Sequence, residues 1–189
     1  MKFPATATLA LSLLLAWVPP LGASEDTAFD YHYLEATFTG QSPSRSAANF
    51  SGTTLRGVFG FDNRLFIHLE LRDTTASDDD TRLDERMVGL GFASTLGEDL
   101  DLVTRFDLME RALDADTVDG FAFNTGLRYR LHPRIETGGF IGWRSLDNNS
   151  EYFGRAELLG RIAGPVWLSM GVLHGEHDRL WEAGLRLTY

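Results

Sequence analysis

The sequence predicts an all-β protein that folds as a single closed, antiparallel, up-and-down transmembrane β-barrel of ten strands. Three observations lead to this prediction. Apolar and polar residues alternate with period two through ten segments, as in strands whose two faces meet different surroundings. Turn-forming residues separate the segments, and most segments have about the 9–11 residues that a tilted strand needs to cross a bilayer. Charged residues within the segments fall almost entirely on one of the two faces.

The predicted strands follow one another from residue 31 to the C-terminus. Their ranges are 31–39, 53–61, 65–72, 85–93, 100–109, 121–131, 135–144, 152–162, 165–174 and 179–189. Because the number of strands is even, both chain termini are expected on the periplasmic side of an outer membrane. Eight strands are the alternative, since the segment 152–162 carries the small residues Gly154, Ala156 and Gly160 on its apolar face.

Residues 1–24 have the layout of a secretory signal peptide. Lys2 supplies the positive charge, residues 9–18 form a short apolar stretch, and small residues near Ala23 and Ser24 suit cleavage. The apolar stretch is too short to cross a bilayer as a helix. We therefore expect a cleaved signal peptide at 1–24 and an outer-membrane barrel domain at 25–189.

The charged face of the predicted strands is nearly balanced in sign. It carries nine arginines and eight acids, whereas the opposite face carries one charge, Arg86, at the end of a segment. Such charges can pair across neighbouring strands at low dielectric, so we predict that they line the lumen. The candidate lumen charge network is Glu35, Arg56, Glu70, Arg72, Asp101, Arg105, Asp107, Arg128, Arg130, Glu136, Arg155, Glu157, Arg161, Glu182 and Arg186; Glu85 and Arg144 share this face.

Alternation alone does not decide which face points outward. A soluble barrel of the lipocalin or fatty-acid-binding type would enclose the apolar face instead. However, the lumen of ten strands is too narrow for so many large apolar side chains, while glycines such as Gly91 and Gly142 leave room for long arginines inside. Aromatic residues also gather near both ends of the strands, as in the girdles of membrane barrels. We therefore place the apolar face against lipid.

The connections between segments differ at the two ends of the predicted barrel. Tight turns at 62–64, 132–134 and 163–165 alternate with longer polar stretches at 40–52, 73–84, 110–120 and 145–151. This pattern predicts short periplasmic turns and longer, acidic external loops.

The last segment alternates apolar residues and ends on an aromatic residue. Trp181, Leu185, Leu187 and Tyr189 form a predicted assembly signal. The segment resembles the terminal strand by which Gram-negative outer-membrane proteins are recognised for barrel assembly. The whole chain resembles small outer-membrane β-barrel proteins, including the sulfation-dependent quorum-factor proteins, in its stretches 88–92, 119–121, 126–128 and 153–155. The resemblance implies an outer-membrane location and no activity.

The function predicted from these features is a structural or surface-interaction role for a barrel with a charge-paired, largely plugged lumen. Ten strands are closer to the filled eight-stranded barrels than to water-filled porins of about 16–18 strands. Inward Phe66, Phe140, Phe153 and Trp167 would fill further space. A narrow channel for ions or very small solutes is the first alternative. As partners we expect outer-membrane lipid, lipopolysaccharide and the barrel-assembly machinery, with a monomer as the expected state.

A lipid-A-modifying enzyme is the second alternative. His174 and His177, with Glu182, could form a His–carboxylate base near the external rim, but Glu176 occupies the position of a deacylase-like serine. We therefore predict no catalytic residue, no cofactor and no metal. The absence of cysteine excludes thiolate sites, and the net charge of −10 argues against nucleic acid as a partner.

Overall fold

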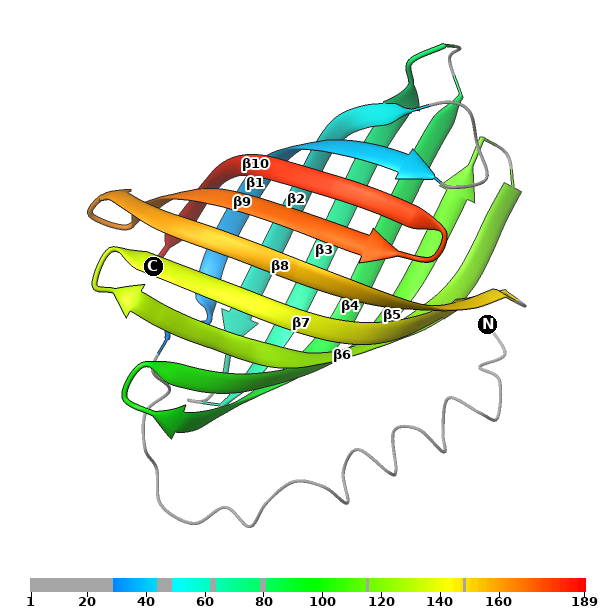
Figure 1. Cartoon of the computed structure of the whole chain (residues 1–189). Coiled ribbons are helices and arrows are strands. Elements are labelled where there is room, and N and C mark those ends of the chain that lie inside the picture. The colour runs from blue at the N-terminus through cyan, green and yellow to red at the C-terminus, as the bar shows by residue number, and fades with distance from the viewer. Residues whose placement is uncertain (1–28, 44–48, 62–63, 79–80, 115, 148) are drawn as a thin grey trace, which may run out of the picture.

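The fold is a closed antiparallel β-barrel (Figure 1), seen in a computed structural model that describes residues 29–43, 49–61, 64–78, 81–114, 116–147 and 149–189. The strands are β1 (His32–Pro43), β2 (Phe50–Gly60), β3 (Leu65–Ala76), β4 (Arg82–Gly97), β5 (Leu100–Leu113), β6 (Asp116–His132), β7 (Ile135–Leu146), β8 (Asn149–Ala163), β9 (Val166–Gly175) and β10 (Asp178–Thr188). The ten-stranded prediction is confirmed, and the eight-stranded alternative is wrong.

Each strand pairs with its neighbours in the chain, and β10 pairs with β1 to close the barrel. The closing register runs from Tyr33 opposite Thr188 to Pro43 opposite Asp178. Every residue of β1 except His32 is therefore paired with β10. Closure leaves no strand edge without a hydrogen-bonding partner, which is the condition for a sheet to span a bilayer. No helix long and apolar enough to cross a membrane occurs among the described residues.

The two ends of the barrel differ in what they carry. The terminal end holds Phe29 and Tyr189, the end of β2, the start of β3 and the connections at 98–99, 133–134 and 164–165. The loop end holds the ends of β1, β3, β5 and β7, the starts of β2, β4, β6 and β8, and the connection at 176–177. The predicted signal peptide at 1–24 lies outside the described residues and stays a prediction.

The strands are longer than the sequence predicts, and the connections at the loop end are correspondingly shorter. The predicted loops at 110–120 and 145–151 are wrong, because β5 and β6 continue pairing to Leu113 opposite Asp116, and β7 and β8 to Leu146 opposite Asn149. A hydrogen-bonded ladder does not need an apolar face once it rises above the lipid. Charged residues on the outer wall, such as the Arg86–Glu110 pair at 3.5 Å, are therefore compatible with strand.

The apolar face points outward, as predicted. Large hydrophobic side chains are exposed all around the wall, with Leu69 at 41%, Leu90 at 54% and Ile141 at 71%. A soluble barrel enclosing its apolar face is thereby contradicted. The exposed area is much larger than the apolar patches found on soluble monomers, and lipid is the solvent that such a belt requires.

Aromatic pairs flank this belt at both ends. Phe38 lies 5.5 Å from Trp181 on the loop side, measured between ring centroids, and Phe59 lies 6.5 Å from Tyr189 on the terminal side. Such amphipathic rings favour the boundary between acyl chains and headgroups. The arrangement agrees with the two predicted girdles.

Inward glycines make room mainly for phenylalanine rings rather than for arginines, which corrects the prediction. A Cβ placed on Gly91 would lie 2.0 Å from the ring of Phe66, and one on Gly142 would lie 2.4 Å from the ring of Phe153. Both glycines therefore allow an aromatic side chain of the neighbouring strand to lie flat across the lumen wall.

The outward belt predicts a depth-dependent cost for charge. We expect Leu69→Arg to destabilise the barrel by about 2–4 kcal/mol, because a cation near the bilayer midplane loses its hydration. Thr75→Arg, on the same strand and face but near the loop end, serves as the matched control and should cost far less. Urea unfolding of the two variants in lipid vesicles measures the difference, and equal stabilities would contradict the membrane register.

Candidate functional site in the barrel lumen

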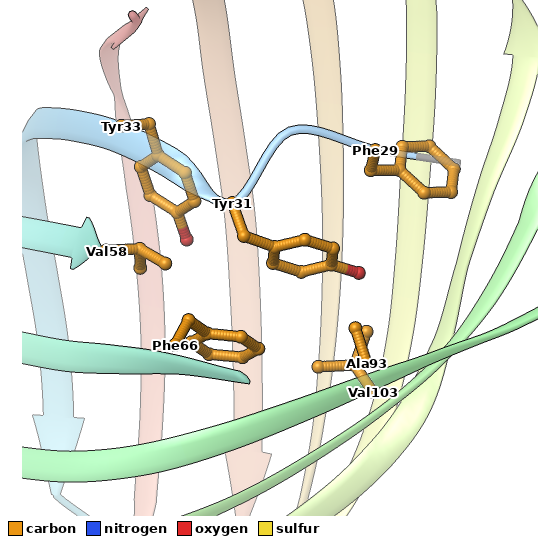
Figure 2. Close-up of a cluster of buried hydrophobic side chains, with 7 residues drawn as sticks. All are labelled: Phe29, Tyr31, Tyr33, Val58, Phe66, Ala93 and Val103. Atoms are coloured by element: carbon orange, nitrogen blue, oxygen red, sulfur yellow. The ribbon is translucent and has the colours of Figure 1, made fainter. Parts of the chain in front are cut away.

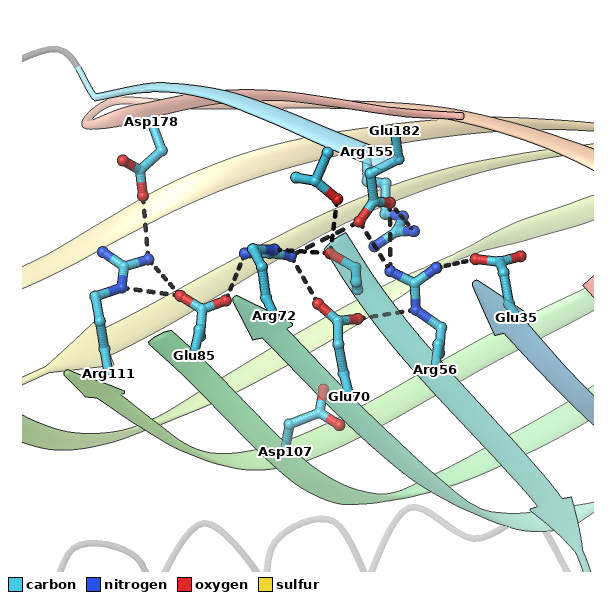
Figure 3. Close-up of polar contacts among 12 residues, drawn as sticks. Glu35, Arg56, Glu70, Arg72, Glu85, Asp107, Arg111, Arg155, Asp178 and Glu182 are labelled. Carbon is cyan, nitrogen blue, oxygen red and sulfur yellow. Dashed lines mark hydrogen bonds and ion pairs between the residues drawn. The ribbon is translucent and has the colours of Figure 1, made fainter. Parts of the chain in front are cut away.

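The centre of the lumen is an arginine surrounded by three carboxylates (Figure 3). Arg56 on β2 donates to Glu35 on β1 through Nη1, to Glu70 Oε2 on β3 at 2.8 Å, and to Glu182 Oε1 on β10 at 3.2 Å. Its side chain is almost fully buried, and so are those of all three partners. The guanidinium fork therefore joins four strands on both sides of the closing seam.

The network continues from this centre towards the loop end. Arg72 on β3 donates to Glu70 and to Glu85 on β4, both at 2.7 Å. Arg111 on β5 then bridges Glu85 at 2.6 Å and Asp178 on β10 at 3.1 Å. Because Asp178 belongs to the last strand and Arg111 to the fifth, this link crosses the lumen rather than following the wall (Figure 3).

The loop-end mouth is closed by a second crossing. Arg144 on β7 donates to Asp178 at 2.5 Å and to Glu151 on β8. His177 Nδ1 lies 3.1 Å from Glu151 Oε2, and the His177 backbone N–H donates to the same oxygen at 2.8 Å. Glu151 thus ties the connection at 176–177 to the network.

A further branch leads towards the terminal end. Arg186 on β10 donates to Glu35 at 2.6 Å, and Arg155 on β8 donates to Glu182 at 2.9 Å. Glu157 lies 3.6 Å from Arg186 Nη2. These contacts bring β8 into the group of strands that the network cross-links.

A buried histidine on β3 forms a smaller cluster beside the network. His68 Nδ1 lies 3.0 Å from Asp107 Oδ1 on β5, and Arg105 donates to Asp107 Oδ2 at 2.7 Å. His68 and Asp107 are both fully buried. The pair joins β3 to β5 across the inner face of β4, where Gly89 leaves space for Asp107.

Aromatic side chains close the terminal end (Figure 2). Phe29 and Tyr31, which precede β1, point into the lumen, and the ring of Tyr31 stacks on Phe66 with centroids 4.9 Å apart. Tyr31 also donates to Asp101 Oδ2 at 3.1 Å. The guanidinium of Arg128 lies over the ring of Phe29 at 4.6 Å, so the plug is held by cation–π attraction as well as by packing.

Little open space is left inside. The lumen between these groups holds a cavity of about 80 Å³, lined from Tyr31 near one end to Asp178 near the other. A wider vestibule of about 300 Å³ lies at the loop end, bounded by Arg111, Arg144 and His177. Side chains thus separate the vestibule from the terminal end.

The predicted network residues divide into two groups. Glu35, Arg56, Glu70, Arg72, Arg105, Asp107, Arg155, Glu157, Glu182 and Arg186 lie together in the middle of the lumen, and Asp101, Arg128 and Glu136 lie at the aromatic plug. Two assignments need correction. Arg130 lies at the terminal mouth, 3.4 Å from Asp99, and Arg161 is exposed there with its guanidinium over Trp167. Each lies two residues before the end of its strand, beyond the enclosed part of the lumen.

Sequence reasoning missed several network members. Arg111, Glu151 and Asp178 were assigned to loops, yet they supply the crossings at the loop end. Their period-two register with Asp107, Arg155 and Glu182 was the available signal. Phe29 and Tyr31 were missed as a plug because they precede the first predicted strand or stand at its start.

The predicted His–carboxylate group at the rim is not formed as expected. His177 pairs with Glu151, whereas Glu182 lies deeper and pairs with Arg56 and Arg155. His174 is exposed on the outer wall. Among the described residues, no group of three or more His, Asp or Glu side chains is placed to hold a metal ion.

The assembly-signal residues Trp181, Leu185, Leu187 and Tyr189 all lie on the lipid-facing side of β10, each at least 44% exposed. Their side chains are therefore accessible along the closing strand. Recognition by the assembly machinery stays a prediction.

No protein-family model matches the sequence, and no curated protein matches it. Solved structures do match. The chain is similar to the NanC porin at 11% identity over 82% of this chain and 100% of the porin, with a TM-score of 0.53. It is similar to the KdgM porin in complex with disordered oligogalacturonate at 10% identity, over 83% of this chain and 99% of the porin, with a TM-score of 0.51. An outer membrane channel from Pseudomonas putida F1 matches at 9% identity, over 89% and 100%, with a TM-score of 0.51.

The chain has the outer-membrane β-barrel fold. At these identities the likeness establishes the fold, and together with the exposed apolar belt it gives the outer membrane as the location. The finer resemblance to the quorum-factor proteins stays a prediction.

The central arginine provides a direct test of the network. Arg56→Met should destabilise the barrel by about 3–5 kcal/mol, because it leaves three buried carboxylates without their shared cation. Arg82→Met is the matched control, since Arg82 pairs with Asp73 at the exposed rim, and it should leave stability unchanged. Urea unfolding measured by heat-modifiable gel mobility compares the two. An Arg56→Met barrel as stable as the control would refute the structural role of the network.

Proposed function

We propose that this protein is an outer-membrane barrel that is closed to solutes, with a structural or surface-interaction role. The single observation that carries the proposal is the pair of barriers across the lumen. The charge network crosses the lumen where Arg111 on β5 and Arg144 on β7 both bind Asp178 on β10, and the aromatic plug formed by Phe29, Tyr31 and Phe66 packs at the terminal end. Residual space of about 80 Å³ between them suits a few water molecules rather than a solute path.

The balance of charge supports a structural role for the lumen. Most arginines in its middle have carboxylate partners at 3.3 Å or less, so few charges are left to attract a permeant ion. A buried ion pair resists separation, because removing either partner leaves an unpaired charge in a region of low dielectric constant. The network therefore holds the wall rigid. We propose that the barrel is a monomer whose partners are outer-membrane lipid and lipopolysaccharide.

A narrow channel is the second candidate, and one observation favours it. The rings that close the terminal end include two, Phe29 and Tyr31, from the segment preceding β1 rather than from within the barrel wall. Movement of that short segment would remove two rings and would break the backbone hydrogen bond from Gly60 N–H to the Tyr31 carbonyl and the Tyr31–Asp101 hydrogen bond, while the pairing from His32 onward stays in place. In this candidate, residues 29–31 gate a path for water or small ions through the vestibule and the central cavity.

Planar-bilayer recording separates the two candidates. The wild-type barrel is expected to give no stable, discrete conductance steps, because both barriers are in place. Phe29→Ala/Tyr31→Ala removes the movable rings and leaves the ion pairs of Arg56, Arg72 and Arg111 intact. Steps in this variant alone would support the gated path, and steps in neither protein would support closure by the network. Stable steps in the wild-type protein would contradict the closed lumen.

We also propose that the barrel does not modify lipid A. The carboxylate beside His177 is already engaged by Arg144, and Glu182 is held in the lumen by Arg56 and Arg155. Mass spectrometry of lipid A from cells with and without the protein should give identical profiles. A changed acylation pattern that is lost in His177→Ala would contradict this proposal.

A further inference from the structure

A row of polar side chains crosses the outer wall at the loop end of β9, β10 and β1, three strands that lie side by side (Figure 1). Arg179 on β10 is opposite His174 on β9 and opposite Ser42 on β1. All three residues are exposed, whereas the adjacent residues Leu180 and Gln41 are buried on the lumen side. The row therefore faces away from the lumen, on the same side of the wall as the apolar belt.

Arg179 is unpaired within the described part of the chain, where it forms no ion pair and no side-chain hydrogen bond. The exposed arginines of the same rim on β4 differ from it. Arg82 Nη2 lies 2.5 Å from Asp73 Oδ2 on β3. Arg86 Nη1 lies 3.5 Å from Glu110 Oε1 on β5. The guanidinium of Arg179 thus keeps all of its N–H donors for a partner outside the chain.

The acidic side chains of this rim are concentrated on other strands. Glu110 on β5 is opposite Asp119 on β6, and both are on the outward side with the acids of β3 and β4. Beside the row, Glu176 belongs to the connection at 176–177 and forms no ion pair within the described residues. Ser42 adds no charge, and its hydroxyl donates to Asn49 at 2.7 Å. The sector of β9, β10 and β1 therefore presents a cation that no carboxylate contacts.

The depth of the row follows from the aromatic girdle next to it. Trp181, two residues from Arg179 along β10, packs with its ring centroid 5.5 Å from that of Phe38 on β1. Two residues of a tilted strand rise about 5 Å along the membrane normal. Arg179 is therefore at the level of the lipid headgroups. Because both chain termini are at the other end of the barrel, these are the headgroups of the outer leaflet.

The indole of Trp181 adds a further donor on the membrane side of the row. Trp181 is opposite Gly40 on β1, and a Cβ placed on that glycine would lie 2.3 Å from the indole Nε1. The glycine therefore allows the ring to lie flat against the wall at this depth. Trp181 is 50% exposed, and within the described residues its indole N–H makes no hydrogen bond. An indole N–H at the membrane boundary is free to donate to a headgroup.

We infer that Arg179, His174 and Trp181 bind a phosphate group of lipid A, the membrane anchor of lipopolysaccharide, on the outer wall of the barrel. A guanidinium binds phosphate through two parallel charge-assisted hydrogen bonds, and the imidazole and indole groups each donate a further one. The sugar headgroup of lipid A carries its phosphates at the depth of this row, and its acyl chains extend along the apolar belt below. The inference rests on the proposal that lipopolysaccharide is a partner of the barrel, and it does not depend on whether the lumen conducts.

Native mass spectrometry of the refolded barrel in detergent tests the inference, with diphosphoryl lipid A as the probe. The wild-type barrel should retain lipid A saturably. Arg179→Gln should raise the Kd about tenfold, the effect of losing a charge-assisted contact. Arg86→Gln removes the same charge from the paired arginine on β4, so it is the matched control and should bind like the wild type. Heat-modifiable mobility confirms that each variant is folded, and equal affinity in the two folded variants would overturn the site.

Two further probes identify what is recognised. Lipid A without its phosphates should bind the wild-type barrel as weakly as Arg179→Gln binds the diphosphoryl form, and equal binding of both lipids to the wild type would overturn phosphate recognition. Inorganic phosphate at the same concentration should not displace lipid A, and displacement would overturn lipid as the source of the phosphate. If the wild-type barrel retained no lipid A, the proposal of lipopolysaccharide as a partner would fail. Retention that Arg179→Gln does not weaken would overturn this site alone.

Discussion

Closure of the sheet between β1 and β10 is the constraint on which the rest of the structure depends. Lipid offers no hydrogen bonds, so every backbone N–H and C=O within it must be paired in the wall. A closed ladder has two faces, and successive side chains must alternate between them. Apolar residues such as Leu90 then contact lipid, and ionic residues such as Arg56 on the other face line the lumen.

A lumen lined by many charged side chains is stable when those side chains pair with one another. Arg56 contacts three carboxylates and Arg111 contacts two, so each guanidinium serves more than one strand. This sharing explains how the lumen can be lined by charged side chains and still contain little open space. The terminal end differs, because the aromatic rings of Phe29, Tyr31 and Phe66 pack inside the lumen there.

Period-two alternation was enough to predict the ten strands, the outward belt and most of the central network. The pattern failed where the outer surroundings change from lipid to water, because outward side chains there become charged while the ladder continues. For this reason Asp178 and Arg111 looked like loop residues. Pairing partners could not be predicted either, since contacts across the lumen depend on shear and barrel radius. The aromatic plug could not be predicted from alternation, because Phe29 precedes the alternating region.

Spin labelling tests the central claim, that side chains sort strictly by face, most directly. The chain has no cysteine, so single cysteines can be introduced at Leu168, Ser169 and Met170 on β9 without background. Nitroxide accessibility to oxygen reports contact with lipid, and accessibility to a water-soluble nickel chelate reports contact with water. We predict high oxygen accessibility at 168 and 170 and protection from both reagents at 169. Lipid contact at 169, or water contact at 168 and 170, would contradict the account.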